Sequence, residues 1–245
     1  MNVVILAAGT GSRLLPLTRN TPKSLLDLGN GYTLLERQLQ AVAGADLHKV
    51  TLVTGYKAEQ IEAKIQHYAD FEFHVIYNPF YRMANNLVSA WMALKGATEP
   101  TILVNGDDLF KTDIVGTLAK STHDITMVIS RKDAYDDDDM KVIIEDNRVV
   151  DVGKDIHPAK ADGESIGMML FQGPGLREIQ RQLSEMVRHE DQLQLFYLAA
   201  LRALMRAGAP VHFVEARPED WAEVDFHPDL LQMRQQLEQS LPRWE

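Results

Sequence analysis

The chain has 245 residues, of which 45% are hydrophobic, so it is long enough to bury a substantial core. Its formal net charge of −10 argues against a nucleic-acid partner, because duplex-binding proteins present a basic face. The absence of cysteine excludes disulfide bonds, thiolate zinc sites and a cysteine nucleophile. No apolar run approaches the roughly 18 residues of a membrane span, and no basic flank of a signal peptide precedes the first one, so we expect a cytoplasmic protein.

The first half of the chain alternates strand-like and helix-like segments. Residues 3–6 are short, apolar and β-branched, which is typical of a buried parallel strand, and Thr33 with Glu36 forms the capping-box pattern that opens a helix. This alternation predicts a mainly parallel sheet with helices on both faces. Further strands are predicted at 50–53, 73–77 and 101–104, and further helices at 58–68 and 86–95.

The second half departs from this alternation, because four strands follow one another with little helix between them. This pattern predicts a small antiparallel insertion at one side of the same sheet, so we expect a single Rossmann-like α/β domain over residues 1–245. The four strands are predicted at 125–130, 141–145, 149–152 and 168–171, followed by a helix at 191–207, a strand at 211–214 and a C-terminal helix at 228–239.

The loop after the first strand is the most informative segment. It runs Leu6-Ala-Ala-Gly-Thr-Gly-Ser-Arg-Leu-Leu-Pro-Leu-Thr18. Gly9 and Gly11 allow backbone amides to point at phosphate oxygens, and the two small alanines before them let a planar base approach the backbone. Ligands of open α/β sheets bind at the carboxyl ends of the strands, which is where this loop begins.

The placement of charge in the same window indicates a polyphosphate ligand. Residues 1–26 contain no acidic residue but hold Arg13, Arg19 and Lys23, inside a chain of net charge −10. Arginine can bind phosphate through two hydrogen bonds, and lysine offers a compact charge. The G-x-G-x-x-G fingerprint is absent because Leu14 replaces its third glycine, and no Walker loop occurs. A plain βα turn with exposed basic residues is the alternative.

Together with Pro22-Lys23-Ser-Leu-Leu26, this loop resembles the signature of the nucleotidyltransferases that make NDP-sugars and CDP-alcohols. The resemblance implies a nucleotide-binding part at about 1–120 and an acceptor-binding part at about 121–225. It also implies that Arg13 and Lys23 act on the triphosphate in catalysis, with Lys23 near the α-phosphate. The nucleotide-binding residues that it implies in the loop are Ala7, Ala8, Gly9, Gly11 and Ser12.

Two acidic segments are placed to hold the divalent cation that polyphosphate chemistry normally requires. Asp107 follows the fourth predicted strand, at the same sheet edge as the glycine loop, and Glu223 and Asp225 follow the last strand. In the family that this chain resembles, a strand-end Gly-Asp and a late Glu-x-Asp share Mg²⁺, and Asp107 and Asp225 match those positions. A turn or helix-cap role is the alternative for each, and Glu223 could replace or orient Asp225.

The segment 77–91 distinguishes between branches of the family. An aromatic loop is followed by Asn85-Asn86-x-x-Ser89 at the start of a helix, where sugar-1-phosphate enzymes usually carry a glutamine-rich pattern with Gly-Thr-Ala. In this respect the chain resembles the choline-phosphate and aminoethylphosphonate cytidylyltransferases. The resemblance implies nucleotide contacts from Asn86 and Ser89, although Asn86 could equally cap the helix. Tyr81, in the aromatic loop, is a candidate for the acceptor pocket.

The insertion supplies further candidates for that pocket. Lys141 and Lys154 are candidates for the acceptor phosphate, by resemblance to the segments where relatives place a lysine, or are solvated lysines at strand ends. Residues 136–139, four consecutive aspartates, are either a solvated loop or a subsite for a cation. We favour an acceptor with an amine, because carboxylates and aromatic rings attract ammonium groups. The groups that favour it are residues 136–139, Glu164, Tyr81 and Trp221.

These residues predict a magnesium-dependent cytidylyltransferase that joins CMP, from CTP, to a small phosphate or phosphonate acceptor such as phosphocholine or aminoethylphosphonate. The acceptor is already an anion near neutral pH, since the second pKa of a phosphate monoester is about 6, so no general base is expected. A sugar-1-phosphate uridylyl- or thymidylyltransferase with another NTP, or a non-catalytic nucleotide-sensing module, are the alternatives. The sequence leaves open whether the chain forms a homodimer, and we expect neither a nucleic-acid nor a membrane partner.

Overall fold

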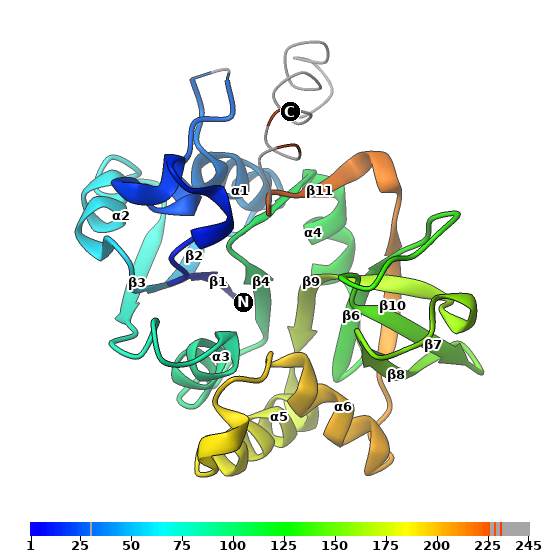
Figure 1. Cartoon of the computed structure of the whole chain (residues 1–245). Helices are drawn as coiled ribbons and strands as arrows, with labels where there is room; N and C mark the ends of the chain where they lie inside the picture. The colour runs from blue at the N-terminus through cyan, green and yellow to red at the C-terminus, as the bar shows by residue number, and fades with distance from the viewer. Residues whose placement is uncertain (30, 226–227, 229–230, 232–245) are drawn as a thin grey trace.

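The computed structural model describes residues 1–29, 31–225, 228 and 231 (Figure 1). Apart from residues 228 and 231, the predicted C-terminal helix at 228–239 lies outside this part of the chain. The central sheet has the strand order β10-β6-β9-β4-β1-β2-β3, with β7 and β8 attached to β9. Its strands are β1 (Asn2–Ala7), β2 (Lys49–Thr54), β3 (Glu72–Tyr77), β4 (Thr101–Asn105), β6 (Ile125–Ser130), β7 (Lys141–Glu145), β8 (Arg148–Gly153), β9 (Gly163–Phe171) and β10 (His212–Ala216).

Strand directions confirm the predicted mixed sheet. Strands β1 to β4 are mutually parallel, with Val3 opposite Val50 on β2 and opposite Ile102 on β4. Strand β9 runs antiparallel between β4 and β6, and β10 pairs with β6 in parallel. The β7–β8 hairpin extends from the first residues of β9, so the predicted antiparallel insertion is confirmed. The fold is therefore a Rossmann-like α/β domain with a small antiparallel part.

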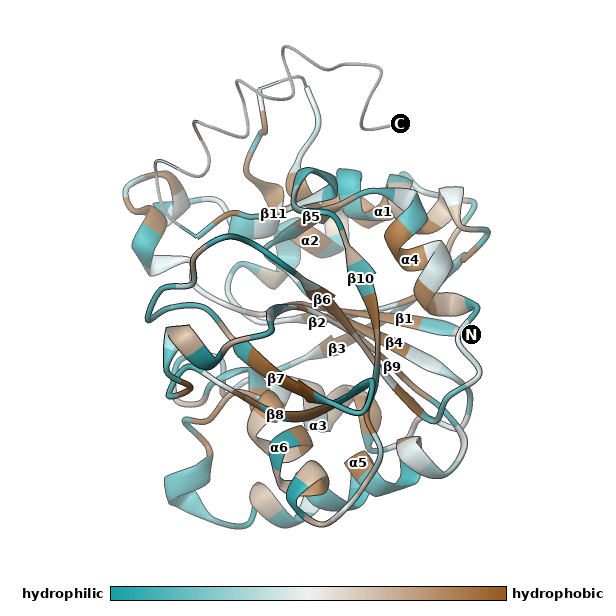
Figure 2. Cartoon of the chain, turned by 90° about the vertical axis from the view of Figure 1, so that its right-hand side faces the viewer, coloured by the Kyte–Doolittle hydropathy of each residue, from teal (hydrophilic) through white to brown (hydrophobic). Residues whose placement is uncertain are grey.

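Alternate residues of β1 point into two separate cores. Val3 and Ile5 pack on one side of the sheet, against α1 (Leu34–Gly44), α2 (Ala58–Ile65) and α4 (Thr112–Ala119). Val4 and Leu6 pack on the other side, against α3 (Asn86–Leu94), α5 (Gly173–Met186) and α6 (Leu198–Arg206). Figure 1 shows these two helix layers, and Figure 2 shows the apolar strands between them. A strand buried on both faces has to be apolar at every position, as the run of residues 3–6 predicts.

The capping box at the start of α1 is confirmed, and it also joins two helices. Thr33 Oγ1 accepts a hydrogen bond from Glu36 N, and Glu36 Oε2 accepts one from Thr33 N at 2.8 Å. The same carboxylate accepts a hydrogen bond from Tyr68 Oη at 2.7 Å and pairs with Lys64 of α2 at 2.8 Å. Burial raises the pKa of Glu36, but these hydrogen bonds outweigh it and lower the pKa to about 2.

Helices α4 and α5 were not predicted. Gly173-Pro174-Gly175 reads as a turn, yet the proline stands in the first turn of α5, where its missing N–H and fixed φ are tolerated. The predicted helix at 191–207 begins only at Leu198, because the preceding residues form a 3₁₀ turn and a loop. A separate two-stranded sheet, β5 (Asp108–Phe110) with β11 (Trp221–Glu223), was also not predicted. None of the helices in the described residues is both long and apolar enough to span a bilayer.

Candidate active site

A cleft of about 860 Å³ opens at the carboxyl ends of the parallel strands. The glycine loop borders it on one side and the β7–β8 insertion on the other. The two glycines of the loop have different roles. Gly11 has φ +60°, and a Cβ there would lie 2.9 Å from Thr18 Cγ2, so this position needs glycine for the loop itself. Gly9 lines the cleft, and no atom of the described residues lies within 4 Å of the position that a Cβ would take there, so this glycine leaves room for a ligand.

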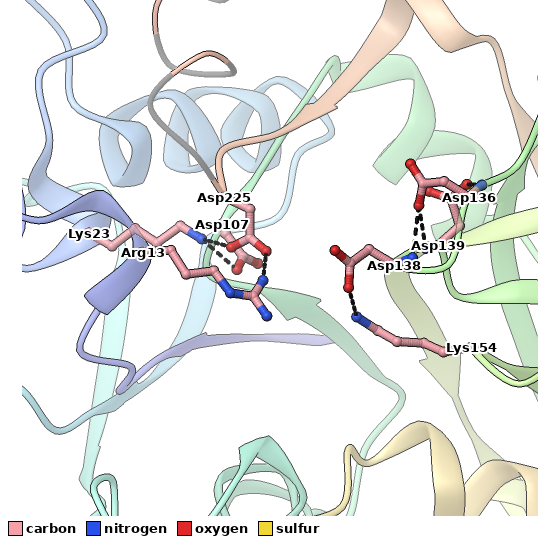
Figure 3. Close-up of polar contacts among 8 residues, drawn as sticks. All are labelled: Arg13, Lys23, Asp107, Asp136, Asp138, Asp139, Lys154 and Asp225. Carbon is pink, nitrogen blue, oxygen red and sulfur yellow. Dashed lines mark hydrogen bonds and ion pairs between the residues drawn. The ribbon is translucent and has the colours of Figure 1, made fainter.

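Lys23 joins the glycine loop to the acidic cluster. Its Nζ donates hydrogen bonds to Asp107 Oδ2 at 2.9 Å and to Asp225 Oδ1 at 2.6 Å (Figure 3). Arg13 pairs with the other oxygen of Asp225. Burial lowers the pKa of Lys23, but attraction to the two aspartates outweighs it and leaves the pKa above its ordinary value. The structure therefore brings together the two predicted catalytic cations and the two predicted metal ligands.

The acidic cluster has the composition of a magnesium site. Carboxylate oxygens of Asp107, Glu223 and Asp225 lie within 4.8 Å of one another. Burial raises the pKa of Glu223 to about 8, and the charges of Asp107 and Asp225 add to this rise. Lys23 and Arg13 balance the charges of the two aspartates. The carboxylate oxygens nevertheless offer the kind of ligand that a hard divalent cation prefers. The residues present therefore fit the cofactor that the sequence predicts.

The small sheet explains how residues 107 and 225 meet. Strand β5 follows Asp107, strand β11 precedes Asp225, and their antiparallel pairing places Glu223 opposite Asp108. Val224 N also donates a hydrogen bond to Asp107 O at 3.0 Å. Burial, and then the charge of Asp107, raises the pKa of Asp108 well above its ordinary value. Asp108 is buried and lies opposite Glu223. The sequence Asp107-Asp108 did not show which of the two aspartates would be buried.

The start of α3 borders the cleft. Asn85 is the helix cap, because its side chain accepts from the N–H of Asn86 at 2.7 Å, so the alternative in which Asn86 caps the helix is wrong. Asn86 Oδ1 instead accepts a hydrogen bond from Tyr197 N at 2.9 Å. Ser89 is buried and accepts from the side chain of Asn78, which sequence analysis did not single out. Both Asn86 and Ser89 line the cleft.

Ala7 and Tyr81 are two further residues that the sequence predicts for the site. The side chain of Ala7 packs into the core beneath α1 and α2, so any nucleotide contact there would come from its backbone. Tyr81 lines the cleft, but its ring lies 6.4 Å from that of Tyr56, and its Cβ approaches Gly55 after strand β2. Tyr81 therefore lies near the end of strand β2, and its acceptor role stays a prediction. Of the predicted nucleotide-binding residues in the loop, Ala8 and Ser12 also line the cleft.

Of the three acceptor candidates Lys141, Lys154 and Glu164, the last two line the cleft. Lys154 pairs with Asp138 at 3.1 Å, and buried Glu164 pairs with Lys132 at 3.0 Å. Burial raises the pKa of Glu164 to about 7 although Lys132 opposes the rise. Lys132 follows β6, and no sequence motif marked it. Lys141 does not reach the cleft, so its predicted contact with the acceptor is wrong.

Lys141 supports the acidic segment 136–139 from below. Its side chain is fully buried, and its Nζ donates hydrogen bonds to the backbone carbonyls of Asp136 and Asp139. A buried ammonium is tolerated only where such acceptors replace water. Asp136 Oδ1 in turn accepts from the N–H groups of Asp138 and Asp139. The segment is thus an ordered structure, and three of its four aspartates line the cleft.

Comparisons with known proteins agree with this geometry. Residues 2–240 match the nucleotidyl transferase family. The chain is 29% identical over 123 residues to the choline-phosphate cytidylyltransferase of Streptococcus pneumoniae. This match covers 50% of this chain and 52% of that relative, so the chain spans about half of its length. It is 26% identical to the 2-aminoethylphosphonate cytidylyltransferase of Lancefieldella rimae, over 94% of this chain and 90% of that one. The solved CTP:phosphocholine cytidylyltransferase of Streptococcus pneumoniae has the same fold, with a TM-score of 0.78, 20% identity and coverage of 96% and 98%.

Proposed function

The chain belongs to the nucleotidyl transferase family, and from this premise we propose that it transfers CMP from CTP to a small phosphate or phosphonate acceptor and releases pyrophosphate. The observation that carries the proposal is the meeting of Lys23 with Asp107 and Asp225 beside the glycine loop. Relatives named as choline-phosphate and 2-aminoethylphosphonate cytidylyltransferases support the choice of CTP and of the acceptor class.

In the proposed reaction, an acceptor oxygen attacks the α-phosphorus in line, and the bond between the α-phosphorus and the bridging oxygen breaks. Lys23 would leave its two carboxylates and bind the α-phosphate oxygens, where negative charge develops. Arg13, half exposed at the mouth of the cleft, would bind the departing pyrophosphate part. Catalysis of this kind rests on positioning and on neutralising charge.

We propose that Asp107 and Asp225 hold Mg²⁺, with Glu223 as a third ligand or an orienting group. When bound, the cation would neutralise charge on the phosphate oxygens. The three carboxylates match the oxygen ligands that Mg²⁺ requires, and Lys23 already occupies a cationic position between two of them. The protein's own contribution is to hold these carboxylates together through the pairing of β5 with β11.

The hydrogen bond of Asn86 supports a pyrimidine with acceptor atoms on its edge. Because Asn86 Oδ1 accepts from Tyr197 N, the carboxamide presents its N–H donors as its remaining hydrogen-bonding groups. Cytosine carries two neighbouring acceptors, O2 and N3, on its pairing edge, whereas uracil and thymine carry a donor at N3. An amide N–H donor can bind either of these cytosine atoms, but it can also bind the carbonyl oxygens of uracil and thymine, so the choice of CTP rests on the named relatives.

The proposal is tested by pyrophosphate release with each of the four NTPs and with dTTP, combined with phosphocholine, 2-aminoethylphosphonate and glucose 1-phosphate. We expect turnover with CTP and one of the first two acceptors, and loss of turnover when a chelator removes divalent cations. Preference for UTP or dTTP with the sugar phosphate would transfer the protein to the sugar branch of the family. Nucleotide binding without turnover of any pair would indicate a non-catalytic nucleotide-sensing module.

A further inference from the structure

An internal cation lies at the acceptor side of the cleft. Lys154 follows strand β8, and its Nζ lies 3.1 Å from Asp138 Oδ1 and 5.6 Å from the centre of the Phe196 ring. A carboxylate and an aromatic face are the two groups that best hold an ammonium ion. Asp138 is 69% exposed, so solvent weakens the pair and its partners can separate at small cost.

The same lysine faces the acidic cluster across the cleft. Lys154 and the carboxylates Glu223 and Asp225 line the same cleft. Figure 3 shows the pair of Lys154 and Asp138 opposite the group formed by Arg13, Lys23 and Asp225. A lysine in this position can reach an anion held between the two groups.

A buried hydroxyl lies at the end of strand β6. Ser130 is 1% exposed, lines the cleft, and its Oγ has no hydrogen-bond partner among the described residues. It stands opposite Glu164 in the pairing of β6 with β9. A buried polar atom without a partner is costly, so this hydroxyl remains available for a hydrogen bond. This end of the cleft therefore has both a cation position and an unused hydrogen-bonding group.

We propose that Lys154 and Asp138 form an exchangeable ion pair that selects a zwitterionic acceptor. The acceptor's ammonium replaces the Lys154 ammonium at Asp138, and the released Lys154 binds the acceptor's phosphate or phosphonate. Because the acidic segment is held by the buried Lys141, Asp138 is already in place before the ligand arrives. The inference rests on the proposed function, since it names the acceptor class of the same cleft.

The exchange predicts effects of opposite sign for two acceptors that differ only at the tail. When 2-aminoethylphosphonate binds, its ammonium forms the ion pair with Asp138 that Lys154 loses. With 2-hydroxyethylphosphonate, Lys154 must leave Asp138 without compensation. Removing the charge of Asp138 therefore weakens binding of the first compound and strengthens binding of the second. A fixed anionic pocket without exchange would not strengthen the second.

The test measures the Kd of both compounds by isothermal titration calorimetry, using the full chain with and without Mg²⁺ and α,β-methylene-CTP. For Asp138→Asn we expect 2-aminoethylphosphonate to bind about tenfold more weakly and 2-hydroxyethylphosphonate about two- to fivefold more tightly, since exposed ion pairs contribute little. Lys154→Met should weaken both compounds, and Lys154→Arg should restore both. Asp137→Asn is the control, because it removes the same charge from a neighbouring aspartate that does not line the cleft, and it should leave the Kd of both compounds unchanged.

The exchange is overturned if Asp138→Asn shifts both compounds in the same direction or changes neither, if Lys154→Met leaves both unchanged, or if the wild-type protein binds neither. Retained unfolding temperatures show that the variants are folded. The proposed function fails separately, if both compounds bind as expected but no NTP yields pyrophosphate with them.

Discussion

Replacing Lys23 with alanine should change two properties in opposite directions. Its Nζ lies 2.9 Å from Asp107 and 2.6 Å from Asp225, and its side chain is only 13% exposed. The wild-type ammonium therefore shares its carboxylate partners with the proposed Mg²⁺. Alanine removes both the contact to the α-phosphate and the competitor for the cation.

The size of each effect follows from this geometry. Loss of one group that stabilises developing charge costs about 10²- to 10³-fold in turnover. Two unit charges 4 Å apart repel by about 4 kcal/mol at an effective dielectric constant of about 20. Because both carboxylates are about one quarter exposed, solvent and movement of the lysine reduce this to about 1–2 kcal/mol. The magnesium concentration for half-maximal activity should then fall about tenfold.

The assay is pyrophosphate release at saturating CTP and acceptor, across a titration of Mg²⁺. Lys120→Ala is the matched control, because Lys120 is exposed at the end of α4 and does not line the cleft. It should leave both turnover and the magnesium titration unchanged. Turnover of Lys23→Ala within threefold of the wild type would show that Lys23 does not stabilise the developing charge. A higher magnesium requirement would show that Lys23 does not compete with Mg²⁺.

Three further predictions concern the carboxylates of the proposed metal site, the capping box and the glycine loop. Asp107→Asn and Asp225→Asn should each raise the magnesium requirement at least tenfold, because a neutral amide is a poorer ligand; an unchanged titration curve for both contradicts the shared site. Glu36→Gln should lower the free energy of unfolding by about 1–2 kcal/mol at pH 7, after allowance for solvent screening. Since the folded pKa of about 2 lies below the unfolded pKa of about 4.3, this difference is present above pH 4.3 and is lost as the pH falls towards 2, which denaturant titrations at several pH values measure. Gly9→Ala should weaken nucleotide binding with less than about 0.5 kcal/mol loss of stability, whereas Gly11→Ala should cost about 1–2 kcal/mol; equal stability losses would show that Gly9 is not kept open for a ligand.

Local signals in the sequence were sufficient for much of the fold. The run at residues 3–6 is apolar at every position because helices cover both faces of β1, and this needs no knowledge of its partners. Thr33 and Glu36 lie one helical turn apart, so their capping box is a short-range interaction visible in the sequence. Helix α5 was missed because Gly173-Pro174-Gly175 serves equally as a turn or as a helix start.

The catalytic candidates divide in the same way. The glycine loop begins at the end of β1, and Asp107 lies just after β4. Parallel strands bring such ends to one edge of the sheet, so the proximity of the loop region to Asp107 was predictable, whereas the exact contact of Lys23 with Asp107 was not. The approach of Asp225 depends on the pairing of β5 with β11, between segments more than 100 residues apart. Such short strands have too few residues for a periodicity signal.

Local composition and spacing were enough to predict a sheet covered by helices on both faces, the glycine loop, and the residue types needed for phosphate and cation binding. Which polar side chain faces the cleft depends on the three-dimensional packing. Lys141 and Lys154 are equivalent in sequence, both at strand ends of the insertion, yet one is buried under the acidic segment and the other faces the proposed metal site. Strand register and the surrounding backbone carbonyls set that difference, because they determine which ammonium can be stabilised without water.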